Sequence, residues 1–255
     1  MSGNDQKIRR REQILAVISQ HGFITVGELA GRFFISEPTV RRELASLEAE
    51  GVIRRSHGGA SPVSNGLRQP IAFRKTSCLV QKRKIGQAAA ELVCDGDIIF
   101  IDTSTTALMT VEHLRSRYGV IVVTNSLAVM EMIAEMHLPA DRISCRCTGG
   151  ELNGESFGLV GSTAEQYVSG IRFDKFFFST PCVSETGRIS DFSERETYLR
   201  RTVLGNTRES VFLFDAEKLG KEAVYTVSEL RRMTYIVTDA PLDQTVVGTG
   251  QCIQV

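Results

Sequence analysis

Short apolar runs alternate with helical patterns along most of the chain, and this alternation limits the fold more than any other feature of the sequence. Six runs predict buried strands, at residues 98–101, 120–123, 143–147, 173–178, 211–214 and 235–237. Apolar side chains at helical spacing predict helices at residues 81–92, 105–114, 127–136, 164–168 and 194–204. Strands that are apolar at nearly every position are typical of a parallel sheet covered by helices on both faces. The sequence therefore predicts an α/β domain built on a mostly parallel sheet.

Polar residues follow these strands where the strands end, and ligands of parallel sheets bind at that edge. Hydroxyls and backbone N–H groups at helix starts bind phosphate, whereas Asp and Asn side chains suit sugar hydroxyls. The pattern predicts an effector site for a phosphorylated polyol. Its candidate residues are Asp102, Thr103, Ser104, Thr105, Thr106, Thr124, Asn125, Gly149, Gly150 and Lys218.

Each of these residues also has an ordinary structural interpretation. Ser and Thr after strands often cap helices, and paired glycines often permit a tight bend. Lys218, taken alone, reads as a surface lysine. The shared position of the candidates at strand ends is what favours a binding site.

The first sixty residues have a different pattern, that of a three-helix domain. Apolar spacing predicts helices at residues 7–20 and 26–33, and a third that begins after Ser36 and ends at Gly51. One face of this third helix is apolar, and the opposite face sets Arg42 among small residues. Small side chains let a helix approach a surface closely, which suits entry into the major groove of DNA.

Positive charge is concentrated in the same region. Residues 1–75 hold 12 Lys and Arg against 7 Asp and Glu, and residues 76–255 hold 18 against 23, so net charges of +5 and −5 cancel in a neutral chain. Glycines after Gly51 predict a basic hairpin, or wing. The alternative is a generic three-helix domain with solvated arginines. The candidate DNA-binding residues are Ser36, Pro38, Thr39, Arg41, Arg42, Ser46, Arg54, Arg55 and His57.

The run ISEPTVRRELASLEAEGVIRRSHGGA, residues 35–60, resembles the DNA-binding signature of DeoR-type transcriptional regulators. The departures are conservative: Val40 for isoleucine, Glu43 for aspartate and Ile53 for leucine. Residues 82–239 resemble the DeoR sensor domain, whose strands end in loops like those at 102–106, 124–126, 149–150 and 215–220.

The resemblance implies a third helix that reads a double-stranded operator and a wing that touches the DNA backbone. It implies a sensor fold similar to sugar-phosphate isomerases, an effector that is a phosphorylated sugar or a related intermediate, and repression of a carbohydrate operon. It also implies a homo-oligomer, either a dimer or a tetramer. The sensor loops depart from the family pattern at Ser104, where the family has glycine, and in DAEKLG at residues 215–220.

We therefore expect three parts: residues 1–60 as a winged helix-turn-helix domain, 61–75 as a linker and 76–255 as an α/β effector-binding domain. No run of about 18 apolar residues predicts a membrane span, and the polar N-terminus has no signal-peptide pattern, so a cytoplasmic protein is expected. Six cysteines without a CxxC pair predict reduced thiols, and neither a metal nor a cofactor is expected.

Two other classes of function compete with a regulator. A sugar-phosphate isomerase or deaminase needs a positioned general base, for which the candidates are Asp102, Asp191, Glu194 and Glu196. No histidine accompanies the strand ends and no GxSxG motif is present, so we do not expect an enzyme. An architectural DNA binder is the other alternative, and the clustered polar strand ends argue against it.

Overall fold

The computed structural model describes residues 10, 11, 13–15, 17, 18, 21–49, 51–56, 58–62, 71–139 and 141–255. Its contacts divide the chain into two compact units, Met1–Leu79 and Val80–Val255. The division expected from the sequence, at residues 60 and 75, stays a proposal.

The first unit is a winged helix. The described residues between 10 and 18 are helical, and the elements that follow are β1 (Ile24–Thr25), α2 (Val26–Phe33), α3 (Glu37–Ala49), β2 (Ile53–Ser56), β3 (Gly59–Pro62) and α4 (Ile71–Thr76). The strands form an antiparallel sheet in the order β1-β3-β2. Thr25 caps α2, because its hydroxyl accepts from the backbone N–H of Glu28 while the Glu28 carboxylate accepts from the N–H of Thr25.

The wing depends on a glycine at the point where two strands meet. A Cβ on Gly59 would lie 2.4 Å from the backbone oxygen of Ile24. Only a residue without a side chain allows β1 and β3 to pair this closely. The side chains beneath this sheet form the unit's apolar core, which includes Ile14, Ile18, Leu29, Leu44 and Leu47.

The second unit contains the elements α5 (Leu79–Glu91), β4 (Ile98–Ile101), α6 (Thr105–Val111), β5 (Val120–Thr124), α7 (Leu127–Glu135), β6 (Ile143–Cys147), β7 (Glu151–Asn153), β8 (Gly158–Val160), α8 (Ser162–Ser169), β9 (Phe173–Phe178), β10 (Cys182–Val183), β11 (Arg188–Asp191), α9 (Glu194–Gly205), β12 (Thr207–Phe214), β13 (Tyr225–Glu229), β14 (Tyr235–Thr238), α10 (Gln244–Val247) and β15 (Gln251–Gln254). Seven strands form one parallel sheet in the order β15-β14-β12-β9-β4-β5-β6. The predicted parallel α/β class is therefore confirmed.

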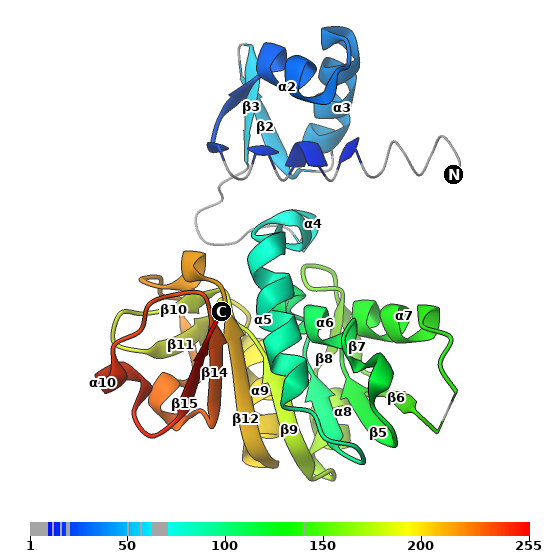
Figure 1. Ribbon diagram of the computed structural model, residues 1–255, viewed down its shortest axis with the longest axis vertical. Coiled ribbons are helices and arrows are strands. Elements are labelled where there is room, and N and C mark those ends of the chain that lie inside the picture. The colour runs from blue at the N-terminus through cyan, green and yellow to red at the C-terminus, as the bar shows by residue number, and fades with distance from the viewer. Residues whose placement is uncertain are drawn as a thin grey trace. The chain divides into compact units, whose positions relative to one another are not determined.

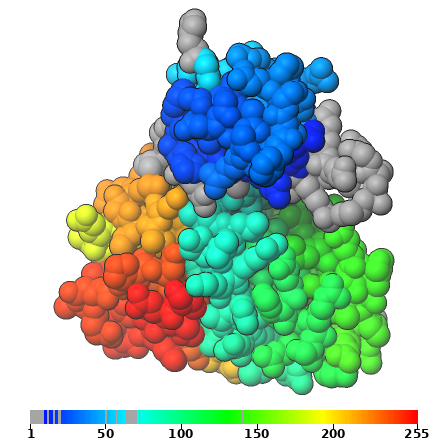
Figure 2. Space-filling view, turned by 45° about the horizontal axis from the view of Figure 1, so that its top comes forward, coloured from blue at the N-terminus to red at the C-terminus, as the bar shows by residue number. Residues whose placement is uncertain are grey.

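Helices cover both faces of this sheet. In Figure 1, α5 lies in front of the sheet and α9 lies behind it. Figure 2 shows α5 at the surface between the C-terminal residues and the residues near 120–140, as the strand order requires. Between α9 and the sheet, six phenylalanines from β4, β9 and β12 pack against one another, among them Phe100 and Phe176 with ring centroids 5.4 Å apart. The FDKFFF run is thus a central buried strand.

The short strands were not predicted from the sequence. The hairpin β7–β8 and the antiparallel sheet β10-β11-β13 were not predicted, and β15 follows the last strand that was. These strands are two to five residues long and lack continuous apolar runs, so hydrophobic periodicity cannot detect them. Strand β12 also begins at Thr207 rather than 211, because pairing with β9 extends into the polar residues TRES.

Two further expectations concern the cysteines and membrane-spanning helices. All six cysteines are free thiols. Among the residues that the structure describes, no helix is both long enough and apolar enough to cross a membrane.

Candidate functional site

Helix α3 of the first unit separates its faces as the sequence predicted. Val40, Leu44 and Leu47 are at most 1% exposed and pack in the core, while Pro38, Arg42 and the small residues of the opposite face are exposed. Arg42 on α3 and Arg54 on β2 are exposed, and neither side chain makes a hydrogen bond or ion pair with a described residue. Two guanidinium groups are therefore available to an external anion.

The other basic candidates are held by carboxylates of the same helix. Arg41 lies 3.3 Å from Glu37, and Nε of Arg55 lies 2.6 Å from Glu48. The Glu48 carboxylate also accepts from the backbone N–H of Arg55, so it fixes the wing strand to α3. His57, the remaining basic candidate, lies outside the described residues.

The hydroxyl candidates lie at the start and in the middle of α3. Ser36 is exposed directly before the helix, and its Oγ lies 2.9 Å from Oγ1 of Thr39. Ser46 is half-buried one turn beyond Arg42. These three residues border the exposed face that carries Arg42.

Glu43 is a feature of α3 that the sequence did not reveal. Its side chain is 4% exposed and lies 2.7 Å from both Arg10 and Arg11 of the first helix. Burial alone would raise the pKa of Glu43, but the hydrogen bonds from the two arginines outweigh it and hold the pKa below its usual value. This carboxylate fixes α3 to the first helix.

In the second unit, the predicted polar residues gather at the edge where the parallel strands end. We call this edge the rim and define it as residues 102–106, 124–126, 148–150, 179–180 and 215–218. They follow β4, β5, β6, β9 and β12 respectively. Every residue of 102–106 and 124–126 is at most 6% exposed, so polar groups are buried here in unusual density.

The loop after β4 opens α6. Oδ1 of Asp102 accepts from the backbone N–H of Ser104 at 2.9 Å, and Oγ of Ser104 in turn accepts from the N–H of Ala107 as the helix N-cap. Thr105 and Thr106 are the first residues of the helix. The capping interpretation that the sequence left open therefore holds for Ser104.

A buried arginine on α9 joins three carboxylates below this loop. Nε of Arg200 lies 2.8 Å from Asp102, its Nη1 lies 2.8 Å from Asp191, and its Nη2 lies 3.6 Å from Glu196. All four side chains are less than 10% exposed. Although burial opposes its charge, the three carboxylates raise the pKa of Arg200. Three of the four acids considered as general bases thus share one arginine as their positive partner.

Glu196 is the one of these three acids whose pKa is clearly shifted. Burial raises its pKa, and neither Arg200 nor the hydrogen bond from Ser156 offsets this effect. Its oxygens accept from Oγ of Ser156 at 2.6 Å and from Oγ1 of Thr103 at 3.3 Å. Thr103, an effector candidate, is thereby tied to α9.

Lys218 lies in the rim rather than on the open surface. Its Nζ donates to Oγ of Ser179 at 2.7 Å and to Oγ1 of Thr106 at 3.0 Å, and it lies 3.6 Å from Asp215. The side chain is 17% exposed. One ammonium group therefore bridges the loops after β4, β9 and β12.

The loop after β5 leaves one buried acceptor unused. Oγ1 of Thr124 donates to the backbone oxygen of Ile101, and Nδ2 of Asn125 donates to the backbone oxygen of Leu159. Oδ1 of Asn125 is buried and has no hydrogen-bond partner among the described residues. An unsatisfied buried acceptor costs about 1–3 kcal/mol, so its presence in the rim points to an external donor.

The glycines after β6 serve the hairpin β7–β8. Gly149 and Gly150 both have positive φ, and a Cβ on Gly150 would lie 2.7 Å from the backbone oxygen of Val160. On the same hairpin, a Cβ on Gly158 would lie 2.1 Å from Cγ2 of Thr103. The hairpin therefore lies directly against the loop after β4.

Sequence reasoning missed Arg200, Ser156 and the hairpin. A charged residue in a helical pattern reads as a solvated surface residue, and nothing in the local sequence marks Arg200 as buried. The run NGES at residues 153–156 signals a turn but not what that turn covers.

Comparison with known proteins agrees with both units. Residues 77–240 match the DeoR C terminal sensor domain, and residues 10–65 match the DeoR-like helix-turn-helix domain. The chain belongs to the DeoR family. It is a DNA-binding transcriptional regulator, and its family is one of regulators rather than enzymes.

Several proteins named as repressors are similar to this chain along nearly their whole length. The lactose phosphotransferase system repressor of Streptococcus mutans is 31% identical over 93% of this chain and 94% of that protein. The transcriptional repressor CsqR of Escherichia coli is 29% identical over 90% and 87%. The glycerol-3-phosphate regulon repressor of Escherichia coli is 26% identical over 92% of each chain.

Among solved structures, ribose 5-phosphate isomerase A of Methanocaldococcus jannaschii is 20% identical over 54% of this DeoR-family chain and 53% of its own, with a TM-score of 0.39. Similarity at this level does not establish a shared activity.

Proposed function

We propose that this DeoR-family regulator represses a carbohydrate operon by binding its operator, and that a phosphorylated sugar or related intermediate bound at the rim changes its operator affinity. Relatives named as repressors of a lactose phosphotransferase system and of a glycerol-3-phosphate regulon support repression of this kind. Cytoplasmic location, the domain boundaries and a dimeric or tetrameric state remain expectations.

The proposed DNA contacts start from the exposed face of α3. Arg42 and Arg54 carry no partner among the described residues, so binding DNA costs them no existing ion pair. Arg41 and Arg55 already pair with glutamates, and they would exchange those partners for phosphates. We therefore assign base or phosphate contacts first to Arg42 and backbone contacts to Arg54.

The buried acceptor of Asn125 is the observation that carries the effector site. A sugar hydroxyl supplies the donor that its Oδ1 lacks. Lys218 offers a cation in the same rim, where its contacts to the hydroxyls of Thr106 and Ser179 are replaceable by phosphate oxygens. A ligand with both a phosphate and hydroxyls matches this pair of groups.

The DNA part is tested with a duplex selected from a random pool by the purified protein. Arg42→Ala should weaken operator binding by about 5- to 150-fold at matched salt, because a bidentate arginine contact is worth about 1–3 kcal/mol. Arg83→Ala, at an exposed position of α5, is the matched control and should leave operator affinity unchanged. Unchanged affinity in the Arg42 variant would show that α3 is not the recognition helix.

The effector part is tested by a thermal-shift screen of the full chain against phosphorylated sugars and their neutral parents. A phosphorylated compound should raise the melting temperature of the wild type and fail to do so for Asn125→Leu. If none stabilises the folded wild type, the architectural interpretation, in which the second unit serves only assembly, is favoured instead.

A further inference from the structure

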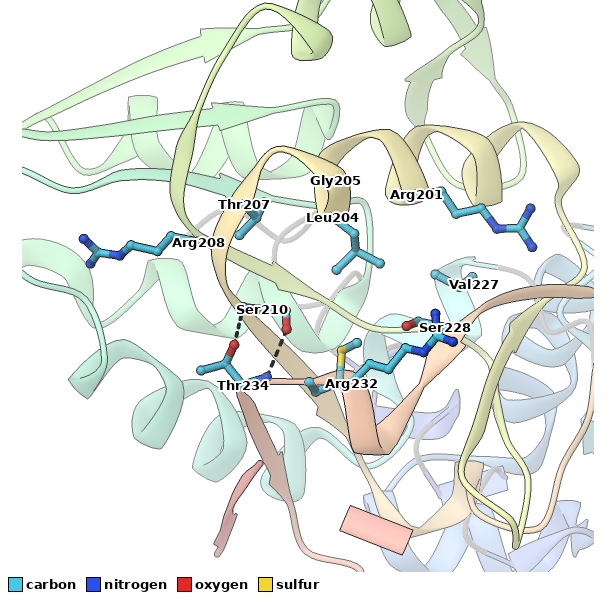
Figure 3. Close-up of a pocket in the computed structure, with 11 residues that line it drawn as sticks. Arg201, Leu204, Gly205, Thr207, Arg208, Ser210, Val227, Ser228, Arg232 and Thr234 are labelled. Atoms are coloured by element: carbon cyan, nitrogen blue, oxygen red, sulfur yellow. Dashed lines mark hydrogen bonds between the residues drawn. The ribbon is translucent and has the colours of Figure 1, made fainter. Parts of the chain in front are cut away.

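Two features of the described residues have no part in the proposed function. One is a pocket of about 390 Å³ that is lined by the C-terminal part of α9, the first residues of β12 and the residues before β14. Figure 3 shows the side chains of Arg201 and Arg208 directed away from Leu204 and from each other, so these two cations do not face a common ligand. The other feature is Phe34, an aromatic residue in the turn between α2 and α3.

Phe34 is 95% exposed, more than any other large apolar side chain that the structure describes. Its two neighbours in the chain, Phe33 and Ile35, pack against the apolar core of the first unit. The core therefore takes the residues on both sides of Phe34 and leaves its ring in solvent. Burying that ring against another surface would be favourable, because it removes apolar area from water.

The backbone at Phe34 has a conformation that suits other residues better. Its φ of 53° and ψ of 42° lie in the left-handed region, and its N–H donates to the backbone oxygen of Ala30, which ends α2. Glycine is usual at such a helix end, and a bulky residue there is strained. In the same unit, Gly22 after the first helix and Gly51 after α3 both have positive φ. The turn after α2 thus keeps a phenylalanine that neither the core nor the helix end requires, and strain of this kind is typical of functional sites.

Phe34 lies close to the part of α3 that we assign to DNA. It stands between Arg32 and Ser36, which are both exposed, and two residue steps place its Cα within about 7.6 Å of the Cα of Ser36. The N-terminal residues of a recognition helix are those that contact base edges. In the major groove, the apolar group that a base pair offers is the 5-methyl group of thymine.

We propose that Phe34 is an operator-contacting residue whose ring packs against the 5-methyl group of a thymine near the N-terminal end of α3. The proposal rests on the proposed assignment of α3 as the recognition helix. It accounts for both observations at Phe34. The ring becomes buried only when DNA is bound, and glycine, which the turn favours, would supply no ring for this contact. Phe34 therefore selects thymine at one position of the operator.

Fluorescence anisotropy tests the contact, with the full chain and a duplex that the wild type selects from a random pool. Phe34→Gly should weaken operator binding by about tenfold at matched salt. This factor corresponds to about 1.4 kcal/mol, near the lower end of what burial of a phenylalanine side chain contributes. The melting temperature of the variant should not fall, because glycine adopts the left-handed backbone without strain.

Two further variants exclude other causes of a weaker affinity. Phe34→Asn removes the ring but keeps a side chain that tolerates the left-handed region, so it should weaken binding as Phe34→Gly does. Equal losses would exclude the added flexibility of glycine as the cause. Val224→Asn removes an apolar side chain of the second unit that is 77% exposed, and it should leave operator affinity unchanged.

Replacing each thymidine of the operator in turn by deoxyuridine tests the thymine itself, because deoxyuridine lacks only the 5-methyl group. At one position at least, the replacement should weaken binding of the wild type by about fourfold, the value for one buried methyl group. Phe34→Gly should not respond to the replacement at that position.

The proposal is overturned if Phe34→Gly binds the operator as tightly as the wild type, or if both proteins respond equally to every replacement. Arg42→Ala separates these results from the proposed function. If Arg42→Ala and Phe34→Gly both bind as the wild type does, the assignment of α3 is wrong. If only Arg42→Ala weakens binding, the assignment of α3 holds and the contact of Phe34 is wrong.

Discussion

Arg200 is the residue whose removal most directly tests the account of the rim. It is the cation shared by Asp102, Asp191 and Glu196, and all four groups are buried. Arg200→Met keeps an unbranched side chain of similar length but leaves three carboxylates without a positive partner. Each then has to be buried as an uncompensated charge or take up a proton.

Removal of this positive charge should lower the free energy of unfolding of the second unit. Removing one partner of a buried ion pair costs about 3–5 kcal/mol, and three carboxylates share this partner, so the upper part of that range applies. With an m-value of about 3 kcal/mol per molar urea, the unfolding midpoint of the second unit should fall by roughly 1–2 M. The loss should shrink as the pH falls, because protonation removes the uncompensated charges.

A matched substitution lies on the same helix. Arg195 also forms an ion pair, with Glu151 at 2.7 Å, but its side chain is 62% exposed. Arg195→Met should change the free energy of unfolding by no more than about 1 kcal/mol, because exposed ion pairs contribute little. The reasoning is refuted if urea unfolding at pH 7 shows equal losses for the two variants.

Three further predictions concern single contacts. Gly158→Ala should destabilise the second unit by about 1–3 kcal/mol in urea unfolding, because its Cβ meets Thr103, whereas Gly154→Ala enters open space and should cost less. The pKa of Glu43 is lowered by folding, so its carboxylate stabilises the first unit at and above the usual glutamate range. The difference in stability between wild type and Glu43→Gln should shrink as the pH falls below that range toward the lowered pKa. The pKa of Glu196 is raised by folding, so the wild type should lose stability relative to Glu196→Gln as the pH rises. A series of melting temperatures at different pH values measures this, and parallel curves for the two proteins would contradict the prediction.

The central sheet was predictable because its strands are buried on both faces. Runs such as FDKFFF are apolar enough to be recognised without tertiary information, and parallel pairing then follows from the helices between them. The strand-end rule also located Lys218 correctly, although a lysine alone gives no such signal. The short strands of the hairpin β7–β8 show no hydrophobic periodicity, and only their contact with the rim explains their position.

The buried ion pairs between Arg200 and the carboxylates next to the rim were not predictable. Arg200 lies in the sequence ERETYLRR, which has the charge pattern of a solvated helix, and only the fold brings it into contact with Asp102. The buried Glu43 presents the same difficulty in α3, where a glutamate next to two arginines reads as a surface residue. Local patterns report amphipathic faces, whereas a buried ion pair depends on residues that lie far apart in the chain.

The most direct test of the proposed function is operator affinity measured by fluorescence anisotropy, with and without the phosphorylated sugar that the thermal-shift screen identifies. The account predicts that this compound changes the affinity of the wild type by at least tenfold. It further predicts that Lys218→Met, with an unchanged affinity in the absence of ligand, loses most of that response. An equal response in the wild type and in the Lys218 variant would contradict the assignment of the effector to the rim.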